Sequence, residues 1–261
     1  MNKVICPICS SSSFGKFAGR TYAKCLTCGS LERTRAVYMA LIKFEIPRIG
    51  DQILHIAPEK GLLDKFLSSH SKTYKPVDLF PEKYKYPQGT IQYLDICKDL
   101  YSMPSRSWDL ILHNHVLEHL FCSVNGVLRG FERILKPGGI MLFTIPIHKK
   151  YTTTIEDLNP DLSETERKNR FGQKNHVRLF GNDTIDLIEE SLGENCFFPV
   201  TSLFTQNECK RAGIPWKPHN EPNGHSIFFY RKPEKGNETS ELAQIEEKLK
   251  NVQIQLQNHK K

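Results

Sequence analysis

The strongest constraint on the fold is an alternation of short β-rich runs with helical stretches between residues 51 and 232. Such alternation is typical of α/β domains, in which helices cover a largely parallel sheet. Helices are expected at 62–70 and 124–135, and the last two β-rich runs are placed to form a hairpin. The predicted class is therefore α/β, with seven strands at 51–57, 74–80, 90–96, 108–116, 138–147, 196–204 and 225–232.

Four of the eight cysteines form two Cys-x-x-Cys pairs near the start of the chain. Cys6 and Cys9 are separated by 15 residues from Cys25 and Cys28, a spacing that indicates structural zinc. Four thiolates leave no open position on a tetrahedral ion, so the metal would stabilise the fold rather than catalyse. Four unrelated cysteines are the alternative. The remaining cysteines lack such spacing and are predicted to be small core residues: Cys97, Cys122, Cys196 and Cys209.

Composition and motifs divide the chain into four zones. A zinc ribbon (1–29) precedes an amphipathic linking helix (30–50), with Ser30 as its N-cap and Pro47 at its end. Residues 51–232 form the α/β domain, and 233–261 form a linker and a short heptad helix. Inward positions are expected at Val37, Leu41 and Phe44 of the linking helix and at Leu242, Ile245, Leu249, Val252 and Leu256 of the tail.

The tail leaves two interpretations open. Its 3-4-3-4 apolar spacing is typical of a coiled coil, which would make the protein a homo-oligomer. Two heptads are marginal alone, so a single helix packed on its own domain is the alternative.

Composition narrows the compartment and the partners. The sequence lacks an apolar run near the roughly 20 residues that cross a bilayer, and its first residues lack a secretory apolar centre. We therefore expect a cytoplasmic protein with reduced thiols. The net charge of +7 permits an anionic partner, but the lysines are scattered and do not demand nucleic acid.

Residues 113–120, HNHVLEHL, contain the H-x-x-E-H pattern of inverted zinc proteases at His115, Glu118 and His119. In those proteases both histidines lie on one helix. Here His115 ends an apolar run expected to be a strand, and spacing identifies no third ligand. The pattern is therefore interpreted as the edge of a strand rather than as a hydrolase site.

A nucleotide-binding site is predicted from acidic residues at strand ends. The turn HIAPEKG (55–61) is glycine-poor for a dinucleotide loop, since only Gly61 is present. Asp78 lies 21 residues past Ala57, at the end of the second strand, where a carboxylate accepts both ribose hydroxyls. Asp95 ends the third strand and either receives an adenine amine or caps the following turn.

The ordered motifs DLI…HVLEHL…LKPGG resemble the core of class I S-adenosylmethionine-dependent methyltransferases of the small-molecule type. With the ribbon and CGSLERTR (28–35), the chain is similar to bacterial zinc-ribbon methyltransferases often linked to surface-polysaccharide biosynthesis. The resemblance implies a Rossmann-like seven-stranded sheet and S-adenosylmethionine as cofactor. It departs from the family where His55 replaces an acidic residue and two glycines are missing. The implied cofactor residues are His55, Ala57, Glu59 and Gly61 for the methionine part, Asp78 for the ribose, Asp95 and Ile96 for the adenine, and His113 and His115 near the sulfonium.

Transfer to a hydroxyl also needs a base, for which histidine is suited near neutral pH. Glu118 would either contact substrate or cap its own helix. The polar insertion 149–175 would form a lid, and Arg178 would bind an anionic acceptor. The candidate bases are His115, His148 and His176, with His119 as a fourth; a surface or backbone-bonded histidine is the alternative for each.

The leading hypothesis is an enzyme that O-methylates a sugar, a nucleotide sugar or another polar small molecule in glycan biosynthesis. A first alternative is an RNA (tRNA or rRNA) methyltransferase whose ribbon grips nucleic acid. A second is a non-catalytic scaffold with a degenerate cofactor loop. The ribbon residues that favour RNA are Lys3, Phe14, Lys16, Phe17, Arg20, Tyr22 and Lys24.

Overall fold

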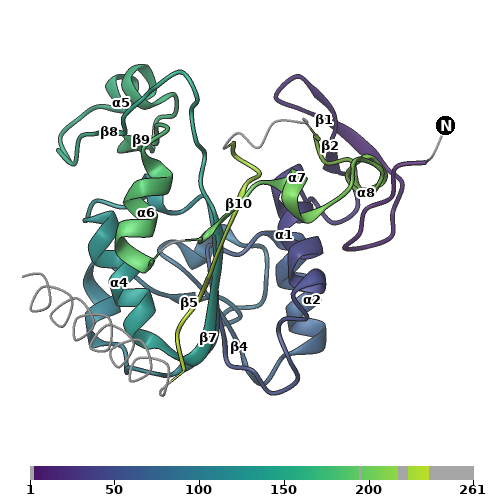
Figure 1. Cartoon of the computed structure of the whole chain (residues 1–261), viewed down its shortest axis with the longest axis horizontal. Coiled ribbons are helices and arrows are strands. Elements are labelled where there is room, and N and C mark those ends of the chain that lie inside the picture. Colours follow the sequence, from purple (N-terminus) through teal and green to yellow (C-terminus); the bar gives the residue numbers. More distant parts are fainter. Residues whose placement is uncertain (1–2, 194, 217–222, 235–261) are drawn as a thin grey trace, which may run out of the picture.

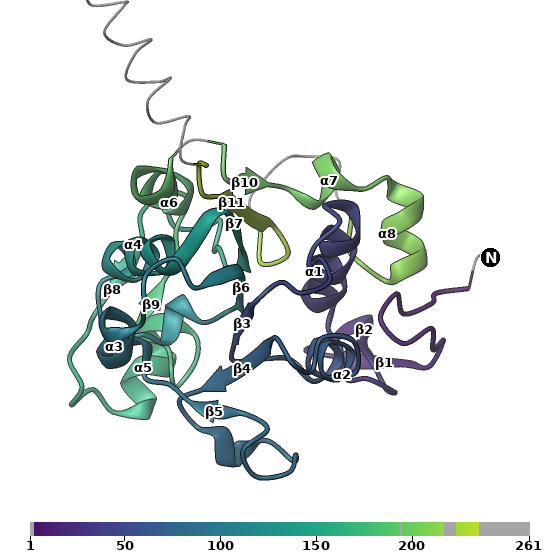
Figure 2. The ribbon, with the colours of Figure 1, turned by 90° about the horizontal axis from the view of Figure 1, so that it is seen from below.

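The computed structural model describes residues 3–193, 195–216 and 223–234. Its centre is a seven-stranded sheet with the order β10-β11-β7-β6-β3-β4-β5 (Figure 2). Strands β3 to β7 are parallel, and β11 runs antiparallel between β7 and β10. All seven predicted runs contribute a strand: β3 (Ile53–Ile56), β4 (Tyr74–Asp78), β5 (Gln92–Tyr93), β6 (Trp108–Asn114), β7 (Leu135–Thr144), β10 (Phe197–Phe198) and β11 (Ile227–Arg231).

Two of the strands are much shorter than predicted. Within 90–96 only Gln92 and Tyr93 are in a strand, because Asp95 caps a helix that begins at the next residue. Within 196–204 the strand ends at Phe198, because Pro199 begins a helical turn. Apolar runs of this length do not by themselves distinguish strand from helix.

Two strands of the sheet contain a proline, Pro76 in β4 and Pro137 in β7. β4 pairs with β5 only at Val77 and Asp78, so Pro76 lies beyond the end of that ladder and needs no second partner there. The segment Lys136–Gly139, predicted as a turn before the strand, is instead an irregularity inside β7, where the register with β6 shifts. Gly138 has φ +75° there, a conformation that glycine adopts without strain.

Helices cover both faces of the sheet. α4 (Val124–Ile134) and α6 (Thr184–Leu192) lie on one face, and α1 (Glu32–Lys43) and α2 (Lys60–Ser69) lie on the other (Figures 1 and 2). Each face has its own apolar core. The other helices are α3 (Ile96–Asp99), α5 (Glu164–Phe171), α7 (Val200–Leu203), α8 (Gln206–Ala212) and the 3₁₀ turns η1 (Pro81–Lys83), η2 (Leu100–Ser102) and η3 (Leu117–His119).

The N-terminal segment is a hairpin of β1 (Phe14–Phe17) and β2 (Arg20–Cys25) packed against α1, α2 and α8 (Figure 2). Arg35 of α1 holds this contact, since its buried guanidinium donates hydrogen bonds to five backbone carbonyls. Their oxygens lie 2.7–3.1 Å from its nitrogens and belong to Tyr22, Ala23, Ser30, Ala212 and Gly213.

The linking helix is shorter than predicted and starts without a side-chain cap. Leu31 occupies the N-cap position of α1, and the hydroxyl of Ser30 lies 3.2 Å from Sγ of Cys28 instead. Ser30 was therefore wrongly predicted as a cap, because its side chain faces the cysteines. Val37 and Leu41 are buried as predicted.

Two cysteine predictions hold and two are wrong. Cys196 and Cys209 are buried core residues. Cys97 and Cys122 form a disulfide instead, because α3 and the segment before α4 bring their Cα atoms to 5.7 Å, within bonding range. This pairing also departs from the expectation of reduced thiols.

Two further expectations concern membrane spanning and self-association. No helix among the described residues is long and apolar enough to cross a membrane. The heptad positions between Leu242 and Leu256 lie outside the described residues, so self-association through them stays a prediction, as does the cytoplasmic location.

A small ladder of β8 (Ile155–Glu156) and β9 (Arg178–Leu179) brackets the insertion that contains α5.

Candidate functional site

A cavity of about 1000 Å³ opens at the carboxyl ends of β3, β4 and β6. Open α/β sheets bind ligands at this edge, where the strand order reverses, and the volume suits a small-molecule site. The insertion supplies part of the wall through residues of and beside α5, including Arg167 and Lys174. Six of the predicted residues line the cavity: Ala57, Asp78, Asp95, Ile96, His115 and His119.

Asp78 is held in place at the end of β4. One carboxylate oxygen accepts a hydrogen bond from the backbone N–H of Phe80 at 2.7 Å, and the other accepts one from the hydroxyl of Tyr84 at 2.8 Å. Burial and the neighbouring carboxylate raise the pKa of Tyr84, which therefore stays a neutral donor. Tyr84 lines the cavity, but no motif or spacing in the sequence singles it out.

Asp95 caps α3 and also faces the cavity. Its Oδ1 accepts a hydrogen bond from the backbone N–H of Cys97 at 3.0 Å, and Oδ2 lies 3.0 Å from Nζ of Lys98. The capping alternative is therefore realised. A carboxylate oxygen has two lone pairs, so capping leaves acceptor capacity toward the cavity.

Ala57 and His115 reach the cavity from left-handed backbone conformations. Their φ angles are +49° and +53°, which are uncommon for residues other than glycine. Ala57 follows β3 and His115 follows β6, so each bend comes where a strand ends at the cavity. Sequence alone does not indicate such bends when glycine is missing.

Two predicted cofactor histidines lie in the core instead of on the cavity wall. His55 is fully buried in β3, and its Nδ1 lies 2.8 Å from the hydroxyl of Tyr74. His113 is fully buried between the rings of Phe131 and Phe143, and neither of its nitrogens has a hydrogen-bond partner. Burial lowers the pKa of His113 to about 3, so its ring is neutral. Both side chains lie within strands and point into the cores, His55 toward Phe66 of α2 and His113 toward Phe131 of α4, so neither reaches the cavity at the strand ends.

Glu59 and Gly61 also lie off the wall. The Glu59 carboxylate lies 3.6 Å from Nε2 of His55 and accepts hydrogen bonds from Asn114 and Thr34. It therefore places a negative charge beside the histidine that replaces the usual acidic residue. Gly61 packs against the ribbon, since a Cβ there would lie 3.3 Å from Sγ of Cys28.

One wall of the cavity is backed by a histidine–glutamate cluster made of His115, Glu118, His119 and His176. Glu118 is 1% exposed, and its Oε1 lies 3.3 Å from Nδ1 of His115 and 4.0 Å from Nε2 of His119. The rings of His119 and His176 are nearly perpendicular, with centroids 4.7 Å apart. Glu118 therefore does not cap a helix. His176 joins Glu118 and His119 as a third residue, which the spacing of the H-x-x-E-H pattern could not identify.

His148 and Arg178 do not line the cavity. His148 lies beyond the end of β7 and is solvent-exposed. It is therefore not among the histidines that could act as a base at the cavity. Arg178 is fully buried, and its guanidinium donates to the carbonyls of Leu117 and Cys122 and pairs with Glu156. These contacts occupy the guanidinium, so the prediction that Arg178 binds an anionic acceptor is wrong.

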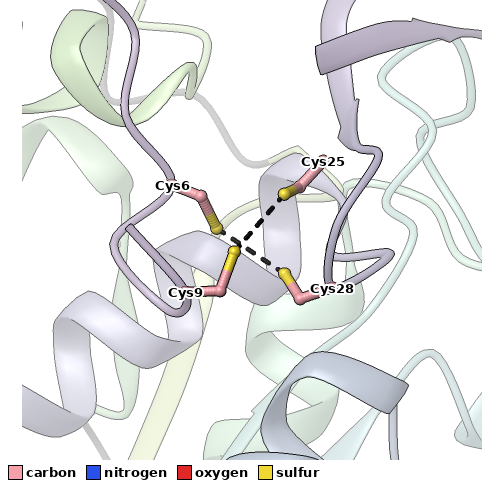
Figure 3. A group of neighbouring side chains, drawn as sticks. All are labelled: Cys6, Cys9, Cys25 and Cys28. Atoms are coloured by element: carbon pink, nitrogen blue, oxygen red, sulfur yellow. Dashed lines mark hydrogen bonds between the residues drawn. The ribbon is translucent and has the colours of Figure 1, made fainter. Parts of the chain in front are cut away.

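The four ribbon cysteines meet in one cluster (Figure 3). Sγ of Cys6 lies 3.7 Å from that of Cys28, and Sγ of Cys9 lies 3.6 Å from that of Cys25. A tetrahedral zinc ion with Zn–S bonds of 2.3 Å requires sulfur–sulfur distances of about 3.8 Å. The cysteine geometry therefore fits zinc.

A family model described as a methyltransferase domain matches residues 54–143, from β3 to β7. The chain carries a class I S-adenosylmethionine-dependent methyltransferase domain. The matched segment contains the strand ends that carry Ala57, Asp78, Asp95 and His115. No curated protein matches the methyltransferase significantly.

Solved structures are similar to the methyltransferase at low identity. An S-adenosylmethionine-dependent methyltransferase from Archaeoglobus fulgidus is 18% identical with a TM-score of 0.47, over 78% of this chain and 95% of the other. One from Mesorhizobium loti is 16% identical with a TM-score of 0.46, over 76% and 98%. Phosphoethanolamine N-methyltransferase 2 from Haemonchus contortus is 19% identical with a TM-score of 0.44 over 75% of this chain, which spans about half (52%) of that protein.

Proposed function

We propose that this methyltransferase transfers the methyl group of S-adenosylmethionine to a hydroxyl of a polar small molecule, such as a sugar or nucleotide sugar in glycan biosynthesis. The observation that carries the proposal is the composition of the cavity at the ends of β3, β4 and β6. Asp78 and Asp95 face it where β4 and β5 end, and His115 and His119 face it after β6. Carboxylates suited to a nucleoside thus share one space with imidazoles suited to a hydroxyl.

In the proposed reaction the acceptor oxygen attacks the methyl carbon in line with the carbon–sulfur bond. The oxygen–carbon bond forms while the carbon–sulfur electron pair leaves with sulfur, which gives S-adenosylhomocysteine. Alignment of the two substrates supplies much of the rate enhancement. The acceptor proton needs a base, and His115 is the only one of the three histidines predicted as catalytic that lines the cavity.

His115 has the hydrogen bonding that such a base requires. Its Nε2 lies 3.2 Å from the carbonyl oxygen of Gly224, which can only accept, so Nε2 carries the proton. Nδ1 faces the carboxylate of Glu118 and is the ring nitrogen that can take up a further proton. The resulting imidazolium would be stabilised by Glu118, whose Oε1 lies 3.3 Å from Nδ1.

The ribbon is proposed to hold one structural Zn²⁺ through Cys6, Cys9, Cys25 and Cys28. Its four sulfurs leave no coordination position for a substrate. The predicted measurement is one equivalent of zinc per chain after purification without added metal. A cysteine-to-serine change in the cluster removes that zinc.

RNA methylation is the second candidate function. The observation that favours it is the exposure of Phe17 and Tyr22 beside Lys16 and Lys24 on the ribbon hairpin. Arg20 contributes less, because Glu32 pairs with its guanidinium at 2.8 Å. Filter binding of bulk tRNA across a salt series tests this candidate, since phosphate contacts give a steep salt dependence.

Calorimetric titration with S-adenosylmethionine and S-adenosylhomocysteine tests the cofactor site. Asp78→Ala should weaken binding roughly 10- to 100-fold, because charge-assisted hydrogen bonds are worth about 1.5–3 kcal/mol. Asp186→Ala, on the exposed face of α6, is the matched control and should bind normally. Equal affinity of wild type and Asp78→Ala would contradict the assignment of Asp78.

Acceptors are then compared by the rate of S-adenosylhomocysteine release. The proposal expects turnover with a hydroxyl-bearing sugar or nucleotide sugar, and mass spectrometry locates the added methyl group on oxygen. Turnover with tRNA and with no sugar would favour the second candidate function instead.

A further inference from the structure

The carboxylate of Glu118 is buried in an arrangement that needs a cation. The side chain is 1% exposed, and neither carboxylate oxygen accepts a hydrogen bond. Its ion-pair partners are the imidazoles of His115 and His119, and the buried guanidinium of Arg178 attracts it at longer range. A buried carboxylate without compensation costs several kcal/mol, so the surroundings of Glu118 call for a positive charge.

The ring nitrogens around Glu118 are oriented by backbone carbonyls. Nδ1 of His119 lies 3.0 Å from the carbonyl oxygen of Asn175, which can only accept a hydrogen bond. Nδ1 therefore carries a proton, and Nε2 of His119 faces Oε1 of Glu118 at 4.0 Å. His115 is held in the same way, with Nε2 directed to Gly224 and Nδ1 facing Oε1 of Glu118 at 3.3 Å. The carboxylate and these ring nitrogens thus converge on one buried space, where a cation would be favourable.

We propose that Glu118, His119 and His176 bind one divalent transition-metal ion at the cavity wall. One ligand atom from each residue lies within 4.8 Å of the other two, so the three can converge on one ion. Two imidazoles and one carboxylate form a common ligand set for zinc, iron and manganese, with positions left for water or substrate. The carbonyl of Asn175 orients His119 as backbone carbonyls orient metal-binding histidines generally.

The fold, and not sequence spacing, assembles this site. Glu118 and His119 lie in η3, directly after β6, whereas His176 follows α5 in the insertion. The backbone N–H of Val177 donates to the carbonyl of Glu118 at 3.0 Å, which fixes the two segments together. The notional H-x-x-E-H pattern therefore contributes Glu118 and His119, and the third ligand arrives 57 residues later.

The site also defines the class of acceptor, a step that rests on the proposed function. His119 is on the cavity wall, so an ion beside it is within reach of an oxygen of the acceptor. A metal ion polarises a bound hydroxyl oxygen and lowers its pKa. The acceptor class is therefore a hydroxyl compound whose reacting oxygen reaches this ion. Its proton passes to His115, which also lines the cavity, as the oxygen–carbon bond forms and the carbon–sulfur bond breaks.

Manganese binding to the full-length, zinc-loaded protein tests the site. Thiolates select zinc over manganese, so added Mn²⁺ reports on the second site and not on the ribbon. We expect one equivalent of Mn²⁺ to bind, measured as loss of the electron paramagnetic resonance signal of the aqueous ion. Glu118→Gln should weaken binding at least about 100-fold, and Glu190→Gln, on the exposed face of α6, should leave it unchanged.

A second readout protects the test against a variant that fails to fold. Co²⁺ added to the zinc-loaded wild type should give weak visible bands without the intense sulfur-to-cobalt transition of thiolate sites. Absence of both Mn²⁺ and Co²⁺ binding to the wild type would overturn the proposal, as would undiminished Mn²⁺ binding by folded Glu118→Gln. S-adenosylmethionine calorimetry on the same sample separates the two failures. Cofactor binding without metal binding refutes the metal site alone, and metal binding without cofactor binding refutes the proposed function alone.

Discussion

The ribbon cysteines and the histidine–glutamate cluster are two groups of metal-binding residue types built in different ways. The cysteines lie between residues 6 and 28 and meet through one local hairpin. The histidine–glutamate cluster joins η3 to a residue beyond α5, and it borders the cavity that the cysteines do not touch. The spacing of residues in the sequence reveals a cluster that forms within one local hairpin. A cluster that joins residues from distant parts of the chain can be recognised only once the fold is known.

The largest expected effect separates the structural role of the ribbon from the role of the cavity. Cys25→Ser should remove the ribbon zinc and lower the melting temperature by about 10 °C or more, because structural zinc binding contributes directly to folding free energy. Differential scanning fluorimetry and zinc analysis measure the two effects. Cys209→Ser, a buried cysteine outside the cluster, is the control and should keep its zinc. Equal zinc contents in Cys25→Ser and Cys209→Ser would contradict the assignment of Cys25 as a zinc ligand.

The next effect tests whether the ribbon depends on Arg35 as well as on metal. Arg35→Met should destabilise the protein by roughly 3–5 kcal/mol, because five carbonyls lose a buried charged donor. Urea unfolding measures the change, and zinc content in the folded variant should stay at one equivalent. Arg129→Met, on the exposed surface of α4, should change stability by no more than about 0.5 kcal/mol. If Arg35→Met also changed the free energy of unfolding by no more than about 0.5 kcal/mol, the metal alone would account for the stability of the ribbon.

A third prediction contrasts two histidines that are two residues apart. His113 is neutral in the core with a pKa of about 3, whereas His115 faces the cavity. Below the unfolded pKa of about 6.5 the unfolded chain takes up a proton that folded His113 refuses, so stability falls as pH falls from 6.5 toward 3. At pH 5 this costs about 2 kcal/mol. His113→Phe should remove that loss, measured as unfolding free energy at pH 7.5 and pH 5.

His113→Phe should also stabilise the protein by about 1–2 kcal/mol at pH 7.5, because two unpartnered buried nitrogens disappear. Cofactor affinity should be unchanged. An unaltered difference between the two pH values would mean that other groups carry the acid sensitivity.

The smallest effect concerns the cofactor loop. Ala57→Gly should stabilise the protein by up to about 1 kcal/mol, because glycine adopts φ near +49° without the steric cost that alanine bears. Urea unfolding measures this gain. A loss of stability would mean that the alanine methyl contributes more by packing than the backbone conformation costs.

The sequence predicts the sheet well because each strand begins as a local apolar run, and Asp78 lies at the strand end where the sequence places it. It fails for His113, where the pleat turns the side chain into the core. It also fails for the Cys97–Cys122 disulfide, since a separation of 25 residues carries no geometric information by itself. Tyr84 could not be identified either, because its contact with Asp78 depends on the path of an irregular segment.

The turn after β3 touches two ligand sites at once. Ala57 lines the cavity, while Gly61, four residues later, packs against Cys28 of the ribbon. If zinc in the ribbon changed the affinity for S-adenosylmethionine through this turn, the cofactor would change the affinity for zinc by the same factor. The occupancy of the ribbon would then set how tightly this methyltransferase holds its cofactor.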